Sequence, residues 1–334
     1  MKTIAGAPAS HVAAFAVMVA FFALAPIAIY PVFLMSALCF ALFACAFNLL
    51  IGYVGLLSFG HAMFLGSAGY AAAYTAKSGL VIDGIALPFG AVLPLHLNLP
   101  PFPPECALVF AVMCTTILGY LTGLIAIRRQ GIYFAMITLA LAQMIFFFSL
   151  QAKFTGGEDG IQAVPRGTMF GVLDLKDTMT LYVVVFGIFL FGFLAIYRII
   201  HSPFGQVLKA IRENEARAIS LGYQVDQYKL IAFVLSAALS GLAGGTKALV
   251  FQLASLTDVH WSMSGEVVLM TLLGGLGTVF GPVVGAFVII AMQHYLAQLG
   301  SWVTIAQGAV FVVCVLTFRR GIIGELARAI KRPL

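Results

Sequence analysis

The stretch LLGGLGTVFGPVVGA, residues 272–286, interrupts an apolar run that extends from residue 264 to residue 296. Its helix-breaking residues are Gly274, Gly275, Gly277, Gly281, Pro282 and Gly285. Proline and clustered glycines break helices. A run of about 30 residues is too long for one membrane span and short for two, because each span needs about 20 residues. The pattern therefore predicts a broken pair of part-helices joined by a turn.

The composition around this stretch is that of an integral membrane protein. Of the 334 residues, 62% are hydrophobic and 9% are charged, whereas soluble domains are about one quarter charged. We expect one all-α polytopic transmembrane domain over residues 1–334, with about eight to ten transmembrane helices once the broken segments are counted. The predicted spans are residues 12–30, 32–51, 58–76, 105–127, 131–150, 179–198, 227–250, the broken segment 264–296, and 299–318.

Basic residues predict the orientation of these spans, since cytoplasmic loops are enriched in Lys and Arg. They gather after residue 127, between residues 198 and 229, and in the tail that holds Arg319, Arg320, Arg328, Lys331 and Arg332. Both termini are then cytoplasmic, and the connections 81–104 and 151–178 lie outside. One full crossing by residues 264–296 would leave the basic tail outside. A hairpin that enters from outside and returns adds no net crossing, so the last helix then brings the basic tail to the cytoplasmic side.

Two other patterns suggest chemistry but lack the residues for it. The glycines of residues 241–249, with Lys247, have no adjacent Gly-Lys-Ser/Thr, and the glycines near residue 275 lack the strand and acidic residue of a dinucleotide site. Catalytic triads and metal-ligand spacings are also missing from the sequence. We therefore expect no enzyme activity, no cofactor, no metal and no nucleic-acid partner. The modest excess of positive charge, +6, fits membrane orientation.

The stretch HSPFGQVLKAIRENEARAISLG, residues 201–222, is unusually charged for this chain. Ser202 is a good N-cap, Pro203 suits the first helical position, and Gly222 suits a C-terminal stop. The pattern predicts one amphipathic cytoplasmic helix over residues 203–221, with Glu213 and Arg217 paired four residues apart. From these residues alone, the helix could lie in lipid headgroups, form a solvated loop, or dock a cytoplasmic partner.

Several stretches in the same order resemble the LivM family, the permease subunits of branched-chain amino-acid ATP-binding-cassette importers. They are NLLIGYVGLLSFGHAMFLGSAGYAAA (48–73), RRQGIYFAMITLALAQMIFFF (128–148), TGGEDGI (155–161), SPFGQVLKAIRENEARAISLG (202–222) and LLGGLGTVFGPVVGA (272–286). Residues 81–104 match no motif of the family, and Gln143 stands where many relatives have Glu. The resemblance implies a bacterial inner-membrane protein.

The resemblance also implies roles for residues and partners. Residues 203–221 resemble the coupling helix that contacts an ATPase subunit, with Pro203, Phe204, Lys209, Arg212, Glu213, Glu215, Arg217 and Gly222 as its candidate residues. The expected partners are a second, LivH-like permease subunit, two ATPase subunits, a periplasmic substrate-binding protein and membrane lipid. Three residues of the outer connection, Lys153, Glu158 and Asp159, are expected contacts of the binding protein, with a solvated loop as the alternative.

A second glycine-rich patch, residues 52–70, gives each half of the chain one interrupted segment, which is a pointer to a translocation pathway. Close helix packing explains the same glycines. The candidate pathway residues are Asn48, Ser58, His61, Thr138, Gln143, Gly274, Gly275 and Gly277. For His61 a structural role is favoured over a catalytic one.

The sequence leaves alternatives for the transported molecule and for the energy source. Related permeases carry urea, short amides or aromatic acids, which sequence does not separate from branched-chain amino acids. An ion-coupled secondary carrier is the rival of another class, and it usually needs an acid within the membrane. Glu266, near the outer end of the broken segment, is the candidate for that role.

Overall fold

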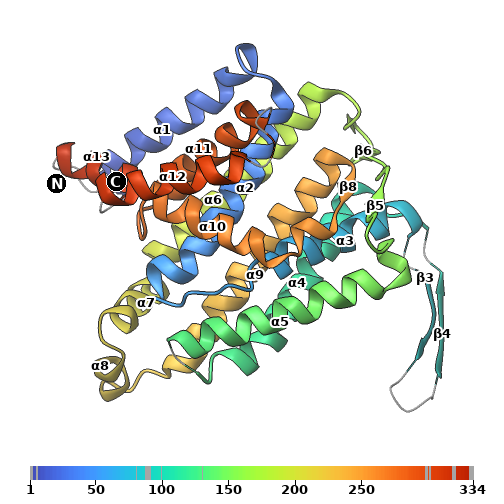
Figure 1. Ribbon diagram of the computed structural model, residues 1–334, viewed down its shortest axis with the longest axis horizontal. Coiled ribbons are helices and arrows are strands. Elements are labelled where there is room, and N and C mark those ends of the chain that lie inside the picture. Colours follow the sequence, from blue (N-terminus) through green and yellow to red (C-terminus); the bar gives the residue numbers. More distant parts are fainter. Residues whose placement is uncertain are drawn as a thin grey trace.

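The computed structural model describes residues 3–4, 7–79, 81–86, 92–98, 100–129, 131–297, 300, 302–317 and 321–330. Within them the fold is a bundle of helices (Figure 1). The helices are α1 Ala9–Leu24, α2 Pro31–Tyr53, α3 Ala62–Ser78, α4 Pro104–Ala126, α5 Ile132–Gln151, α6 Thr178–His201, α7 Pro203–Glu213, α8 Glu215–Ser220, α9 Val225–Phe251, α10 Trp261–Gly274, α11 Gly281–Tyr295, α12 Trp302–Thr317 and α13 Gly321–Ile330.

Short elements join the helices. The 3-10 helices are η1 Ala25–Ile27, η2 Lys153–Thr155 and η3 Leu256–Asp258, and the strands are β1 Thr3–Ile4, β2 Ala7–Pro8, β3 Val81–Ala86, β4 Val92–Asn98, β5 Ile161–Gln162, β6 Thr168–Met169, β7 Leu173–Asp174 and β8 Leu253–Ala254. All pairing is antiparallel, as β1–β2, β3–β4, β5–β8 and β6–β7. Residues 81–98, predicted as part of a polar connection, thus contain a β-hairpin.

Five of the described helices, α2, α4, α5, α6 and α9, are long and apolar enough to cross a membrane. Most predicted spans agree with a helix to within a few residues. The span 58–76 is an exception, because α3 begins only at Ala62 and residues 55–58 are irregular. Gly55 has φ +83° there, a conformation that favours glycine. The tail residues Arg319, Arg320, Lys331 and Arg332 lie outside the described residues.

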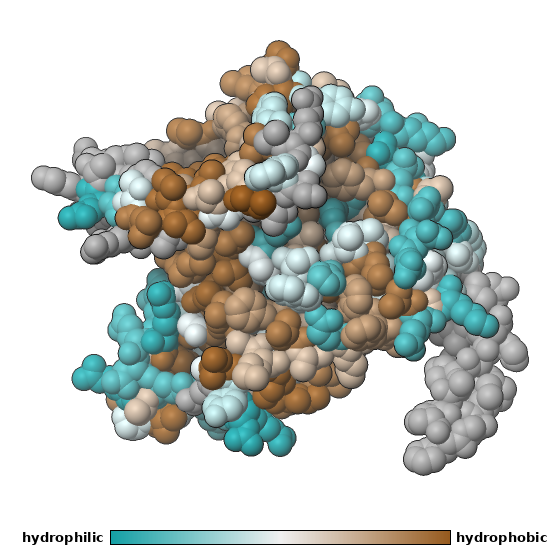
Figure 2. Space-filling view, viewed as in Figure 1, coloured by the Kyte–Doolittle hydropathy of each residue, from teal (hydrophilic) through white to brown (hydrophobic). Residues whose placement is uncertain are grey.

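Helix α2 is the core of the bundle. It packs against α6, α9 and α11, and Leu34, Phe43 and Phe47 are fully buried along it. A helix that is apolar on every side is either buried among other helices or faces lipid, and its neighbours place α2 in the first class. Hydrophilic residues gather near α7 and α8 and near β5 and β6, at the two ends of the bundle, while the sides between them are mainly hydrophobic (Figure 2).

The broken segment forms an antiparallel hairpin of α10 and α11, which pack against each other. Residues 275–280, named here the glycine turn, join them, with Gly275 at φ +125° and Gly277 at φ +73°. A Cβ on Gly285 would lie 1.8 Å from the carbonyl oxygen of Met270. The predicted break in the helix therefore occurs at the glycine turn, where Gly277 has a positive φ, and Gly285 allows close helix packing.

The connections predicted to lie outside meet at one end of the bundle. Lys77 Nζ donates to the carbonyl of Gln162 at 2.8 Å, and the amide of Phe170 donates to Glu105 Oε1 at 3.2 Å. Helix α9 leads from α8 to β8 and, at 1.5 Å per residue, separates this end from α7 and α8 by about 40 Å. The two sets of connections thus lie at opposite ends, as the charge pattern requires.

Candidate functional site

Residues 201–222 form two helices, and the prediction of one helix over residues 203–221 is wrong. Helix α7 ends at Glu213, and Asn214 leaves the helical conformation with φ −157° and ψ 98°. Asn214 Oδ1 then accepts from the amide of Arg217 at 3.0 Å and begins α8. Asparagine competes well for helix N-terminal amides, which makes it a strong N-cap. The predicted Glu213–Arg217 pair is not among the ion pairs of the described residues.

Replacing Asn214 by Ala removes the cap of α8. We expect a cost of about 1 kcal/mol, and faster hydrogen–deuterium exchange of the amides in α8 than in α7. Asn214→Asp keeps an acceptor oxygen at the cap and is the matched control. Equal exchange of α8 in the Ala and Asp variants would contradict this role.

Most apolar side chains of the two helices face the bundle. Leu208, Ile211 and Ala218 are buried, whereas Ile219 is 57% exposed. Ile219 lies on a different side from the buried residues because the chain turns at Asn214. The buried residues fix α7 and α8 to the end of the bundle and leave the other faces exposed.

Several of the candidate coupling residues contact the chain itself. Glu215 pairs with Lys229 of α9 at 2.7 Å, Phe204 stacks on Tyr228 with ring centroids 5.6 Å apart, and Lys209 lies 5.6 Å from the centre of the Tyr53 ring. Lys229 itself is only 2% exposed, so its charge requires a partner. These contacts join α7 and α8 firmly to α2 and α9.

Five candidates are exposed to solvent, namely Pro203, Arg212, Glu213, Arg217 and Gly222. Arg212 bonds the chain itself, and the other four are named here the exposed set. The carboxylate of Glu213 and the guanidinium of Arg217 have no hydrogen bond or ion pair to another side chain in the described parts of the chain. Gly222 has φ +87°, as expected where a helix stops. This exposed set is the part of the segment that a partner protein can reach.

Arg212 is oriented differently from these residues. Its Nη1 donates to the carbonyl of Gly52 at the end of α2, and a Cβ on Gly277 would lie 3.1 Å from the same nitrogen. Helix α7 and the glycine turn, which are separate in the sequence, therefore meet in space.

Asn48 of α2 holds the glycine turn from the other side. Its Oδ1 accepts from the amide of Gly277 at 3.0 Å, and its Nδ2 donates to the carbonyl of Thr278 at 2.8 Å. One side-chain amide thus satisfies two backbone groups that a helix break leaves without partners. Of the predicted pathway residues, Asn48, Gly274, Gly275 and Gly277 lie together here.

His61 lies apart from the glycine turn, in the core. It is fully buried among aromatic rings that include Phe47 and Phe64. Ser236 Oγ donates to the carbonyl of Ala46 at 2.5 Å and lies 2.7 Å from His61 Nε2. The hydroxyl proton is used by Ala46, so His61 donates from Nε2 and leaves Nδ1 as an unpaired acceptor. This arrangement joins α2, α3 and α9.

Ser58 and Thr138 are also buried. Ser58 Oγ accepts from the amide of Gly60 at 3.3 Å, and a Cβ on Gly60 would lie 2.4 Å from the carbonyl oxygen of Thr138. Gln143, on α5, is half-buried. A cavity of about 120 Å³ lies between α1 and α6, with Phe15 and Leu194 in its wall, and none of the predicted pathway residues lines it.

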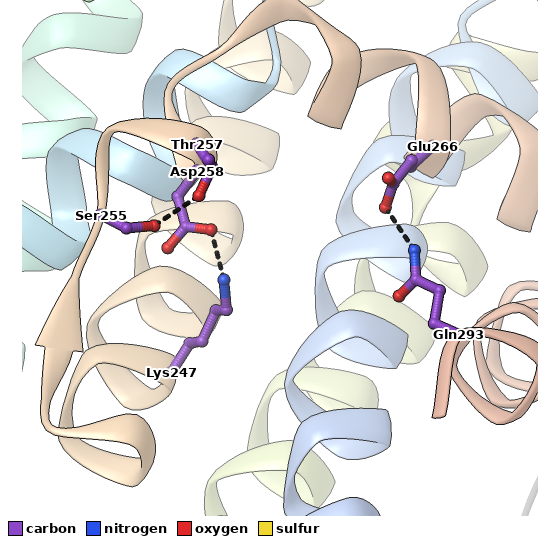
Figure 3. Close-up of polar contacts among 6 residues, drawn as sticks. All are labelled: Lys247, Ser255, Thr257, Asp258, Glu266 and Gln293. Atoms are coloured by element: carbon purple, nitrogen blue, oxygen red, sulfur yellow. Dashed lines mark hydrogen bonds and ion pairs between the residues drawn. The ribbon is translucent and has the colours of Figure 1, made fainter. Parts of the chain in front are cut away.

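A polar cluster at the opposite end of α9 was not predicted. Figure 3 shows Lys247 of α9 paired with Asp258 of η3, and Gln293 of α11 donating to Glu266 of α10. The Lys247 and Asp258 side chains are 15% and 11% exposed, and the Gln293–Glu266 distance is 3.0 Å. A lysine inside a predicted span is itself a signal of a buried partner, and it could have identified this pair and Lys229.

The chain's relatives are known transport proteins. A family model described as "Branched-chain amino acid transport system / permease component" matches residues 29–316. The chain belongs to this family. This permease is therefore a multi-pass membrane transport protein, and its family is one of permeases and not of enzymes.

The permease is similar to the high-affinity branched-chain amino acid transport system permease protein LivM of Salmonella typhimurium, with 24% identity over 83% of this chain and 65% of that protein. It thus spans less than two thirds of that relative's length. A probable LivM of Methanocaldococcus jannaschii is 26% identical over 71% of this chain and 72% of its own. The ribose import permease protein RbsC of Bacillus subtilis is 26% identical over 72% of this chain and 78% of its own. No solved structure matches.

Proposed function

We propose that this permease is a subunit of an ATP-driven importer of branched-chain amino acids in a bacterial inner membrane. A second, LivH-like permease subunit completes the pathway, two ATPase subunits supply energy, and a periplasmic binding protein delivers the cargo. Family membership supports the transport role. The observation that carries the coupling is the exposed set on α7 and α8, at one end of an apolar bundle. Arg212 of α7 bonds the end of α2 and lies next to Gly277 of the glycine turn.

The cargo follows from the family and from the side chains available. The described bundle is mostly apolar, which suits an aliphatic side chain, and helix ends such as those beside the glycine turn suit the charged ends of a zwitterion. The similarity to RbsC makes a sugar the second candidate. Thermal melting of the co-expressed binding protein separates the two, since leucine or ribose raises its midpoint when it binds.

ATP dependence is tested with the reconstituted four-subunit complex in sealed vesicles. We expect leucine uptake that needs internal ATP and the binding protein. Uptake that continues without ATP but requires a proton gradient would overturn this proposal. It would favour a secondary carrier that uses Glu266, which Gln293 holds at 3.0 Å.

Charge reversal of the exposed set tests docking. The double variant Glu213→Arg and Arg217→Glu should weaken co-purification of the ATPase subunits by about tenfold or more, because like charges placed opposite each other cost several kcal/mol. Insertion of the permease into the membrane should not change. Glu158→Arg, at the opposite end of the bundle, is the control and should retain the ATPase subunits. Normal co-purification of the double variant would place the docking surface elsewhere.

A further inference from the structure

We infer that Arg212 positions the glycine turn, so that movement of α7 reaches the α10–α11 hairpin through this side chain. The inference rests on the proposed function and names the residue that links its two parts. It also reverses the sequence-based prediction that Arg212 is an ATPase contact.

Three elements converge on Arg212. The residue belongs to α7, its guanidinium donates to the carbonyl of Gly52 at the end of α2, and Nη1 is the nearest atom to the position of a Cβ on Gly277. The stem of Arg212 also lies against Gly55, whose Cβ would be 3.2 Å from its Cγ. The side chain therefore fills the space between α7 and the glycine turn.

The contacts between the end of α2 and the glycine turn leave little space for the two to move relative to each other. A Cβ on Gly52 would lie 2.3 Å from Asn48 Oδ1 and 2.8 Å from the amide nitrogen of Gly277. The turn and the end of α2 are thus in backbone contact. Closely packed elements transmit a displacement instead of absorbing it.

The far side of the turn is held as tightly. Asn48 bonds both the amide of Gly277 and the carbonyl of Thr278. Gly321, at the start of α13, is also close, with its Cβ position 2.4 Å from Gly275 Cα. The turn therefore rests between α2 and α13, and α7 reaches it through Arg212.

The environment of Arg212 distinguishes this role from docking. Glu213 and Arg217 have exposed charged groups with no side-chain partner in the described residues, whereas the Arg212 guanidinium is engaged with its own chain. A docking role alone does not require the bond to Gly52, although the exposed guanidinium keeps other N–H donors for a partner. A lysine keeps the charge but lacks the planar, fork-shaped donor group, so Arg212→Lys separates the two roles.

The test uses the complete four-subunit complex with leucine as the probe. For Arg212→Lys we expect leucine uptake per ATP hydrolysed to fall about tenfold, the size expected for loss of one hydrogen bond from a charged donor. ATPase co-purification should stay within about twofold, because exposed charges keep their sign. Arg128→Lys, an exposed arginine between α4 and α5, is the matched control and should change neither quantity.

A second variant changes Asn48, the α2 residue that bonds the glycine turn. Asn48→Ala should also lower uptake per ATP, and the double variant with Arg212→Lys should be no worse than the more severe single variant, because both residues act on one turn. Unchanged coupling in Arg212→Lys, loss of ATPase co-purification in it, or additive effects in the double variant would each overturn the inference. A wild-type complex without ATP-dependent uptake would instead overturn the proposed function.

Discussion

Gly285→Ala is expected to separate α10 from α11 and to abolish transport. The new methyl group would lie 1.8 Å from the carbonyl oxygen of Met270, 2.8 Å from the amide nitrogen of Gly274 and 2.9 Å from the carbonyl carbon of Met270. These are backbone atoms, so no side chain can rotate away and the helices must move apart. Overpacking typically costs about 1–3 kcal/mol, and we expect the upper end of this range or more.

The matched control lies on the same hairpin. Gly265, in α10, has open space around its Cβ position. Gly265→Ala should be neutral or stabilising by up to about 1 kcal/mol, because alanine is the better helix former. Thermal unfolding of the purified permease in detergent measures both variants. Equal unfolding midpoints would show that the hairpin can open to admit a methyl group without cost.

Lys247→Met should be strongly destabilising. It leaves the Asp258 carboxylate, whose side chain is 11% exposed, without its cation. Removal of one partner from a buried ion pair costs about 3–5 kcal/mol. Replacing both partners, Lys247→Met with Asp258→Leu, should recover most of the loss, because no unpaired charge then remains.

An exposed ion pair supplies the contrast. Arg328 and Glu325 of α13 are 4.0 Å apart, and the Arg328 side chain is 72% exposed. Arg328→Ala should therefore cost less than about 1 kcal/mol, since water already screens the pair. A Lys247→Met variant with the same small effect would mean that water reaches Asp258 in the folded protein.

The helices of the candidate site were only partly predictable. The hairpin of α10 and α11 follows from glycines and proline that interrupt an apolar run, because a cluster of these residues disfavours a continuous helix. The break at Asn214 was missed, because Ser202, Pro203 and Gly222 already gave a complete set of start and stop signals. Asparagine occurs inside helices as well as at caps. Here Asn214 is a cap, because its side chain accepts a hydrogen bond from the amide of Arg217.

The partners of the site residues were not predictable in the same way. Arg212 has the composition of a docking residue, and its bond to Gly52 depends on two residues 160 positions apart in the sequence. The bond between His61 and Ser236 likewise spans 175 positions. Neither pairing leaves a periodic signal, because each involves one residue on each helix.

The sequence alone determined that this chain is a polytopic α-helical membrane protein with a broken hairpin and a charged segment at one end. Hydropathy, helix-breaking residues and basic residues are local features, so they can be identified from one amino-acid sequence. Only the tertiary structure decided that α2 is the central helix, that Asn48 and Arg212 hold the glycine turn, and that Lys247 has a buried partner. In a chain with 62% hydrophobic residues nearly every helix is apolar, and which faces meet depends on close packing around individual glycines and polar groups.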